Sequence, residues 1–167
     1  MSKAFTSEES DGVPAANRPA PPAGERRPIT PRGFAELKEK LKHARQDRDA
    51  AERDMRAGLL GASSRLQTLG QWAALLEGTL ATVDVVQPPE GTSVTGFGHQ
   101  VAVLDEAGKV SRYTLVGPDE TDPKLGRISA ASPLGRALLG LAVGDEVEVQ
   151  RPRGAALLTV QAIERAE

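Results

Sequence analysis

The stretch Arg127-Ile-Ser-Ala-Ala-Ser-Pro-Leu-Gly-Arg-Ala-Leu-Leu-Gly-Leu-Ala-Val-Gly-Asp-Glu-Val-Glu-Val149 decides the fold of the C-terminal half of the chain. It predicts a strand and then a helix with Ser132 as N-cap and Pro133 at the first position, where a missing N–H costs nothing. Gly140 ends this helix, and a second strand follows at Val147–Val149. The apolar residues that we expect to pack this helix on a sheet are Leu134, Leu138 and Leu139.

Alternating apolar and polar residues on both sides extend this unit to a sheet. Two strands are predicted upstream, at Gln100–Leu104 and Val110–Val116, and one downstream, at Leu157–Ile163. The order of two strands, a helix and two strands indicates an α+β domain in which the helix covers an antiparallel sheet. We expect this domain to span residues 95–167, after a proline-containing linker at 87–94.

Two apolar seams further upstream predict an antiparallel α-helical hairpin, a short coiled coil, over residues 29–86. Thr30 and Pro31 are typical of a helix start, and apolar residues then recur every three or four positions on both arms. The break at Ala57–Ser64 holds two glycines and ends in serines that can cap the second helix. The first seam contains Phe34, Leu37, Leu41, Ala44, Arg48, Ala51 and Met55, and the second contains Leu66, Leu69, Ala73, Leu76, Leu80 and Val83.

Composition limits the remaining possibilities. Residues 1–28 hold five prolines among small and charged residues, which predicts a disordered tail. The chain has no cysteine, and His43 and His99 show no metal-ligand spacing, so we expect no metal site and no cofactor of its own. We expect His99 at the surface or at a strand end. No apolar run approaches the roughly 20 residues of a membrane span, which favours a soluble cytoplasmic protein.

The residues from Arg127 to Val149, together with Tyr113–Gly117 and the acidic turn Asp119–Asp122, resemble the C-terminal signature of the bacterial Gre transcript-cleavage factors, GreA and GreB. Met1–Thr6 also resembles the start of some GreB chains. The resemblance implies an FKBP-like sheet after the hairpin and a transcription elongation factor that acts as a monomer. Its partner would be RNA polymerase, with the globular domain on the β′ subunit and the hairpin in the secondary channel.

The resemblance also implies particular site residues. In Gre factors an acidic loop and a Ser-Pro helix start bind a coiled coil of the β′ subunit, and a basic patch on the hairpin faces the nascent RNA. The Asp that often precedes the Ser-Pro is Ala131 here. The matching polymerase-binding residues are Asp119, Glu120, Asp122, Ser132, Pro133 and Leu134. The basic residues that fall within an arc of about 80° on the first helix are Lys38, Lys42, Arg45, Arg53 and Arg56.

The predicted tip of the hairpin departs from the family. Gre factors use tip carboxylates to help hold a magnesium ion that activates water against backtracked RNA. Here no acidic residue lies between Asp54 and Glu77, so the family's Asp and Glu three residues apart cannot be placed. Glu52 and Asp54 are the nearest candidates, but at i and i+2 they point about 200° apart on a helix. We therefore expect no catalytic residue, no bound metal, and occlusion of the channel or competition with other channel factors.

Other interpretations stay open. The hairpin could be a dimerisation coiled coil in a non-enzymatic interaction module, or the chain could be a channel regulator of the short-hairpin Rnk type. An FKBP-like topology also suggests a prolyl isomerase, whose pocket is walled by aromatic side chains. This domain offers only Phe97 and Tyr113, so we expect a regulator of polymerase and not an isomerase.

Overall fold

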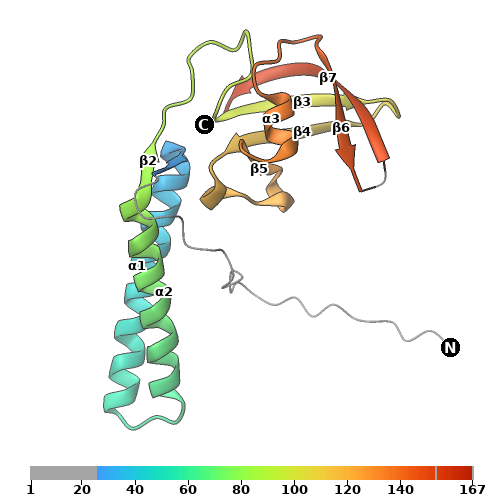
Figure 1. Ribbon diagram of the computed structural model, residues 1–167. Coiled ribbons are helices and arrows are strands. Elements are labelled where there is room, and N and C mark those ends of the chain that lie inside the picture. Colours follow the sequence, from blue (N-terminus) through green and yellow to red (C-terminus); the bar gives the residue numbers. More distant parts are fainter. Residues whose placement is uncertain (1–25, 153, 167) are drawn as a thin grey trace, which may run out of the picture.

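The computed structural model describes residues 26–152 and 154–166, which form a long helical hairpin and a β-rich globular domain (Figure 1). The predicted α+β class, with the hairpin before the sheet, is confirmed. No helix within these residues is both long and apolar enough to cross a membrane. The elements are β1 (Arg27–Ile29), α1 (Pro31–Arg56), α2 (Ala62–Thr82), β2 (Val83–Val85), β3 (His99–Asp105), β4 (Val110–Val116), the 3-10 turns η1 (Pro118–Glu120) and η2 (Pro123–Leu125), β5 (Arg127–Ser129), α3 (Pro133–Leu138), β6 (Glu146–Arg151) and β7 (Gly154–Arg165).

The hairpin forms as its apolar pattern predicts. The Thr30 hydroxyl accepts a hydrogen bond from the Gly33 N–H (3.0 Å), which caps α1. Met55 was predicted in the seam, but it is exposed because it lies in the last turn of α1, next to the tip of the hairpin. The seam residues that are buried between the two helices are Leu37, Leu41, Ala44, Ala51, Ala73 and Leu76.

The start of α2 differs from the prediction. Ser63 and Ser64 lie inside the first turn and do not cap the helix. The N-cap is Gly61, whose φ of 78° lies in the left-handed region that glycine adopts at low cost. This conformation reverses the chain before the serines are reached, so α2 begins at Ala62 without a side-chain cap.

A short parallel strand pair closes the base of the hairpin. In β1 and β2, Arg27 lies opposite Val83 and Ile29 opposite Val85. Ile29 is fully buried against the hairpin seam. The predicted disorder is therefore wrong for Arg27 and Pro28, and residues 1–25 of the predicted tail lie outside the described residues.

The sheet of the globular domain has the strand order β5-β4-β3-β7-β6. The predicted pairs β3–β4 and β6–β7 are antiparallel, and so is the pair β3–β7 that joins them. The sheet is mixed and not purely antiparallel as predicted, because β5 adds to the edge of β4 in parallel. Figure 1 shows α3 across one face of this sheet. The buried residues between the helix and the sheet include Val101, Val103, Leu115, Leu138, Leu158 and Val160.

The prediction is wrong for one of the three helix residues that we expected to pack on the sheet. Leu138 is fully buried, but Leu139 is exposed because α3 ends at Leu138 and Leu139 is its C-cap, with extended backbone (ψ 134°). The chain thereby turns Leu141 toward the core in place of Leu139. The partly buried Leu134 packs on the same cluster, as predicted.

His99 lies at a strand end, as one part of the prediction had it, because it is the first residue of β3, but it is fully buried and not at the surface. Its Nδ1 accepts a hydrogen bond from the Gly96 N–H (3.0 Å), so Nε2 carries the proton and donates to the Pro89 carbonyl oxygen (3.0 Å). A neutral imidazole therefore ties the segment between the hairpin and the sheet to the first residue of β3. A polar side chain is tolerated there because both of its nitrogens are satisfied.

Candidate functional site

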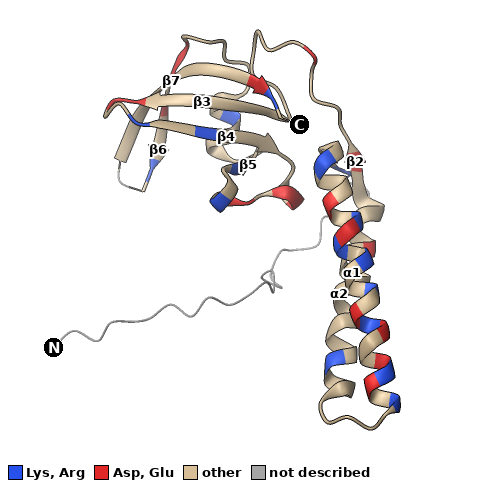
Figure 2. Ribbon diagram, turned by 180° about the vertical axis from the view of Figure 1, so that it is seen from behind, with Lys and Arg blue, Asp and Glu red and all other residues tan. Residues whose placement is uncertain are grey.

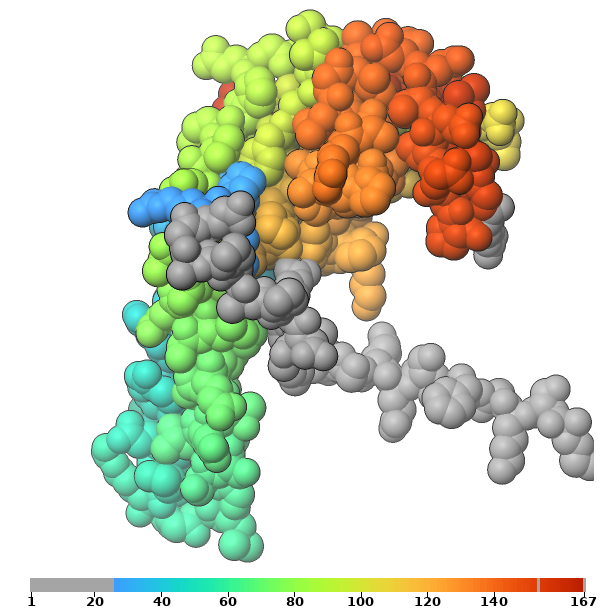
Figure 3. Space-filling view, in the orientation of Figure 1, coloured from blue at the N-terminus to red at the C-terminus, as the bar shows by residue number. Residues whose placement is uncertain are grey.

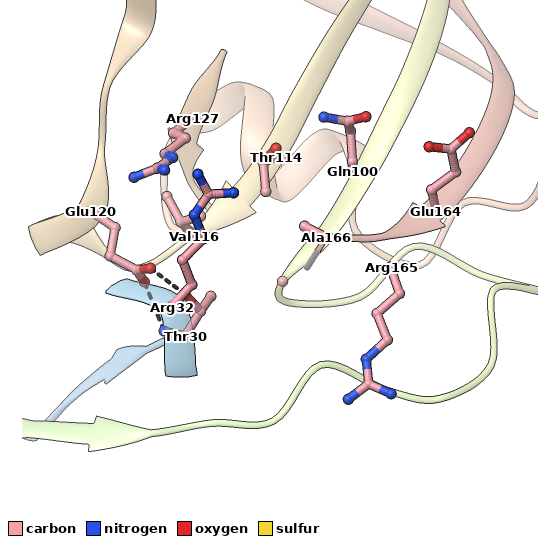
Figure 4. A pocket seen from close by; sticks show the side chains of 11 residues that line it. Thr30, Arg32, Gln100, Thr114, Val116, Glu120, Arg127, Glu164, Arg165 and Ala166 are labelled. Carbon is pink, nitrogen blue, oxygen red and sulfur yellow. Dashed lines mark hydrogen bonds between the residues drawn. The ribbon is translucent and has the colours of Figure 1, made fainter. Parts of the chain in front are cut away.

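The hairpin base meets the globular domain at a seam of polar contacts, which we define by Thr30, Glu36, Glu120 and Arg127. Glu120 of η1 is buried, and its carboxylate accepts hydrogen bonds from the Thr30 N–H (2.8 Å), the Thr30 hydroxyl and the Gly117 N–H (3.2 Å). Figure 4 shows this carboxylate turned toward Thr30 at the start of α1. A buried carboxylate with this many donors is fixed in place, so Glu120 holds the first turn of the hairpin.

A bidentate ion pair crosses the same seam. The Arg127 guanidinium of β5 donates to both oxygens of Glu36 on α1, at 2.7 and 2.9 Å. The hydrogen bond from Arg127 lowers the pKa of Glu36 to about 2, against a smaller opposing effect of desolvation and with further help from Arg32. The Glu36 carboxylate also raises the pKa of Arg127. Both groups are therefore charged at neutral pH, and the fork geometry fixes β5 against α1.

Close backbone packing and a third ion pair complete this contact. Arg27 of β1 pairs with Asp119 of η1 (Nε–Oδ2 3.0 Å), although the two groups are not aligned as a hydrogen bond. A Cβ on Gly117 would overlap the Pro28 carbonyl oxygen, so only glycine allows the two segments to approach this closely. The seam thus sets the direction in which the hairpin leaves the globular domain.

A pocket of about 450 Å³ lies beside the seam. Figure 4 shows side chains from the hairpin base, from β3 and β4, and from the end of β7 around it. Its described lining includes arginines and glutamates but no histidine, lysine or cysteine. The Thr30 hydroxyl in this lining already caps α1 and donates to Glu120. The Thr30 hydroxyl is therefore engaged in these hydrogen bonds and is not a free nucleophile.

The predicted polymerase-binding carboxylates are engaged within the chain. Asp119 and Glu120 belong to the contacts just described, and the Asp122 carboxylate accepts from the Lys124 N–H (3.0 Å) at the start of η2. Sequence reasoning assigned these residues to a partner and missed Glu36, Arg127 and Arg27 as their neighbours. The partners are 90 or 91 positions apart in the chain for Thr30–Glu120 and Glu36–Arg127, and no local pattern indicates such pairs.

The predicted Ser-Pro docking residues lie at the start of α3. The Ser132 hydroxyl accepts from the Gly135 N–H (3.0 Å) and donates to the Ser129 carbonyl oxygen (2.6 Å). Leu134 is half-buried against the core, whereas Pro133 is exposed. Both η1 and α3 contact β5, so the structure brings the two predicted docking segments to neighbouring positions. Among these three residues Pro133 offers the most surface to a partner.

The five basic residues predicted on one face of α1 are all exposed. Lys38, Lys42 and Arg45 line a groove of about 480 Å³ together with Asp49, while Arg53 and Arg56 lie further toward the tip. Figure 2 shows basic and acidic residues alternating along the hairpin. Lys42 pairs with Glu39 (3.4 Å), Arg45 with Glu77 (2.7 Å) and Arg56 with Glu52. Exposed pairs of this kind contribute only about 0–1 kcal/mol each.

The two weak catalytic candidates do not come together at the tip. Glu52 pairs with Arg56 within α1, and Asp54 pairs with Arg65 of α2 (3.4 Å). Across residues 26–152 and 154–166, no cluster of three or more histidine, aspartate or glutamate side chains is placed to hold a metal ion. Figure 2 shows the turn between the helices without acidic or basic colour. The arrangement therefore offers an apolar tip where the family resemblance implies carboxylates.

The dimerisation alternative depends on the second apolar seam of the hairpin, which lies on α2. Ala73 and Leu76 of this seam are buried against α1 within the same chain. A coiled-coil dimer through these residues would first require the hairpin to open. The structure therefore favours an intramolecular hairpin.

The chain is similar to known proteins of one family. Residues 89–165 match the family described as transcription elongation factor, GreA/GreB, C-terminal. Transcription elongation factor GreA of Syntrophobacter fumaroxidans is 34% identical over 141 residues, which cover 76% of this chain and 90% of the relative. The GreA of Novosphingobium aromaticivorans is 35% identical over 152 residues, 84% of this chain and 96% of the relative. These relatives show that the chain belongs to the GreA/GreB family of transcription elongation factors.

The crystal structure of GreA factor homolog 1 (Gfh1) of Thermus thermophilus is also similar. It is 28% identical, and the match covers 84% of this chain and 99% of that one, with a TM-score of 0.41.

Proposed function

We propose that this chain binds RNA polymerase through its globular domain and inserts its hairpin into the secondary channel. There it regulates elongation, in the cytoplasm and without a cofactor of its own, by occupying the channel and not by stimulating transcript cleavage. Membership of the GreA/GreB family supports polymerase as the partner. The observation that carries the regulatory role is the tip, where no carboxylate lies between Asp54 and Glu77 and Asp54 itself is paired with Arg65.

The globular domain would dock on the β′ subunit through the start of α3. Pro133 is the exposed residue there, with Ser132 and Leu134 holding its backbone in position. Asp119 and Glu120 act indirectly in this proposal, because their carboxylates hold the hairpin base and set its direction. Their loss would weaken polymerase binding by misplacing the hairpin.

The basic face of α1 would contact the nascent RNA. Lys38, Lys42 and Arg45 lie together along one groove. Contacts between cations and phosphates weaken as salt rises, because bound counterions are released when the complex forms. This part of the interaction should therefore fall steeply with ionic strength, whereas docking by the globular domain should not.

Binding of a fluorescently labelled protein to purified core polymerase tests the proposal. We expect Pro133→Arg, which places a long cation on the docking surface, to weaken binding at least about tenfold. Val110→Arg is the control, because Val110 is exposed at the opposite end of β4 from the residues that pair with β5. It should bind within about twofold of the wild type. A wild-type protein that does not bind polymerase contradicts the proposal.

A further inference from the structure

The turn at the hairpin tip presents apolar side chains to solvent. Leu59 and Leu60 are 58% and 102% exposed, and Met55 in the preceding helical turn is 42% exposed. Leu60 therefore has no neighbour that shields it. Figure 3 shows the tip standing clear of the globular domain at the far end of the hairpin.

The tip is nevertheless a defined structure. Gly58 and Gly61 have φ angles of 74° and 78°, which only glycine adopts at low cost, and they lie on either side of the two leucines. The Leu59 N–H donates to the Asp54 carbonyl oxygen (3.0 Å), and the Ala62 N–H donates to the Leu59 carbonyl oxygen (3.3 Å). The leucines are thus held outward on a hydrogen-bonded turn. A preorganised apolar surface loses less entropy on binding than a flexible loop.

Polar groups surround this apolar centre. Arg56 pairs with Glu52 below the turn on α1, and Arg65 of α2 pairs with Asp54 across the hairpin. An apolar centre inside a charged rim is the usual anatomy of a protein–protein contact. A nucleic acid is a poorer match, because it is bound through stacking on aromatic rings and free cations, and the turn carries neither.

The size of the surface indicates what kind of complex it serves. Three side chains bury far less than the roughly 800 Å² per partner that a stable protein interface requires. The tip therefore cannot hold a dimer of this chain by itself. It can contribute only where the rest of the molecule already binds, and α1 carries it about 40 Å from the seam.

We propose that Met55, Leu59 and Leu60 form an apolar knob that docks into a pocket of aliphatic side chains on the polymerase. This pocket would lie where the tip of the inserted hairpin ends in the secondary channel. This inference rests on the proposed function. The knob takes the place of metal-holding carboxylates and secures the hairpin by apolar burial. Burying two leucines contributes enough to make the double substitution Leu59→Ser and Leu60→Ser weaken binding about 10- to 100-fold.

The test compares this double variant with a control of equal exposure. Leu75→Ser is matched, because Leu75 is 57% exposed on the middle of α2, away from the tip. A second variant, Leu59→Met with Leu60→Met, keeps both side chains apolar and should bind polymerase as the wild type does. Leu59, Leu60 and Leu75 are all exposed, so we expect each variant to fold, and thermal melting followed by circular dichroism verifies this.

The outcomes separate the two proposals. Weaker binding of the serine double variant to core polymerase, with binding by the control and the methionine variant within about twofold of the wild type, supports the knob. Equal binding by all variants overturns the knob and leaves the proposed function standing. No binding by the wild type overturns both. If the wild type self-associates in solution or binds phosphatidylcholine vesicles and the serine double variant does not, the knob serves another surface and this inference is wrong.

Discussion

The ion pair between Glu36 and Arg127 joins the hairpin base to the globular domain, and its contribution to the free energy of unfolding follows from the pKa of Glu36. Its removal by Glu36→Gln keeps the size of the side chain and one acceptor but abolishes the charge. The pKa of Glu36 falls from 4.5 to about 2, which corresponds to about 3 kcal/mol if fully realised. The side chain is 37% exposed, so solvent screening reduces this to about 1–2 kcal/mol. We expect Glu36→Gln to lower the free energy of unfolding by that amount at pH 7.

The pH dependence follows from the direction of the shift. A carboxyl group whose pKa is lower in the folded state stabilises the fold at pH values above its unfolded pKa. That stabilisation is lost as the pH falls from about 4.5 toward the folded pKa of about 2. The difference in stability between the wild type and Glu36→Gln should therefore be constant from pH 7 to pH 5 and shrink below pH 4.5.

Urea denaturation followed by circular dichroism measures this difference. Glu39→Gln is the control, because Glu39 is more exposed and pairs only within α1, with Lys42 at 3.4 Å. It should change the free energy of unfolding by less than about 0.5 kcal/mol. The reasoning is refuted if the two variants are equally stable at pH 7, or if the deficit of Glu36→Gln persists unchanged at pH 3.

Three further substitutions test the packing by thermal and urea denaturation. Leu138→Ala should destabilise the globular domain by about 2–5 kcal/mol, because Leu138 at the end of α3 is fully buried in the cluster with the sheet residues, and a cost below 1 kcal/mol would contradict this core. Gly117→Ala should destabilise the chain and loosen the seam, because its Cβ would overlap the Pro28 carbonyl oxygen; a neutral effect would argue against this close approach. Gly70→Ala should stabilise the hairpin by about 0.5–1 kcal/mol, because Gly70 lies within α2 and its Cβ meets open space. A loss of stability there would mean that α2 is packed differently.

Local signals predicted much of this fold. Thr30 and Ser132 cap α1 and α3 as expected, because N-capping and a proline at the first helical position involve only neighbouring residues. The hairpin seam also followed from spacing, since a helix places every third or fourth residue on one face. Met55 and Leu139 were misplaced because each lies at a helix end, where the apolar pattern continues but the partner surface does not.

Long-range contacts could not be predicted in the same way. The β1–β2 pair joins residues about 56 positions apart, and each strand is too short to show alternation. His99 is buried because the Pro89 carbonyl and the Gly96 N–H reach its two nitrogens, which depends on how the linker folds back. Glu120 looked like a free acidic loop residue, yet its donors at Thr30 come from the opposite end of the chain. The polar contacts between the hairpin base and the globular domain are therefore set by tertiary packing, which local sequence patterns do not show.

The measurement that tests the central claim most directly is RNA release from a stalled, backtracked elongation complex, with this protein added at increasing concentration in magnesium buffer. Binding to the complex is followed in the same samples. The account predicts saturable binding with no acceleration of transcript cleavage, because the tip offers leucines where carboxylates would hold the metal ion. Accelerated cleavage that Asp54→Ala abolishes would contradict it, and so would the absence of any binding.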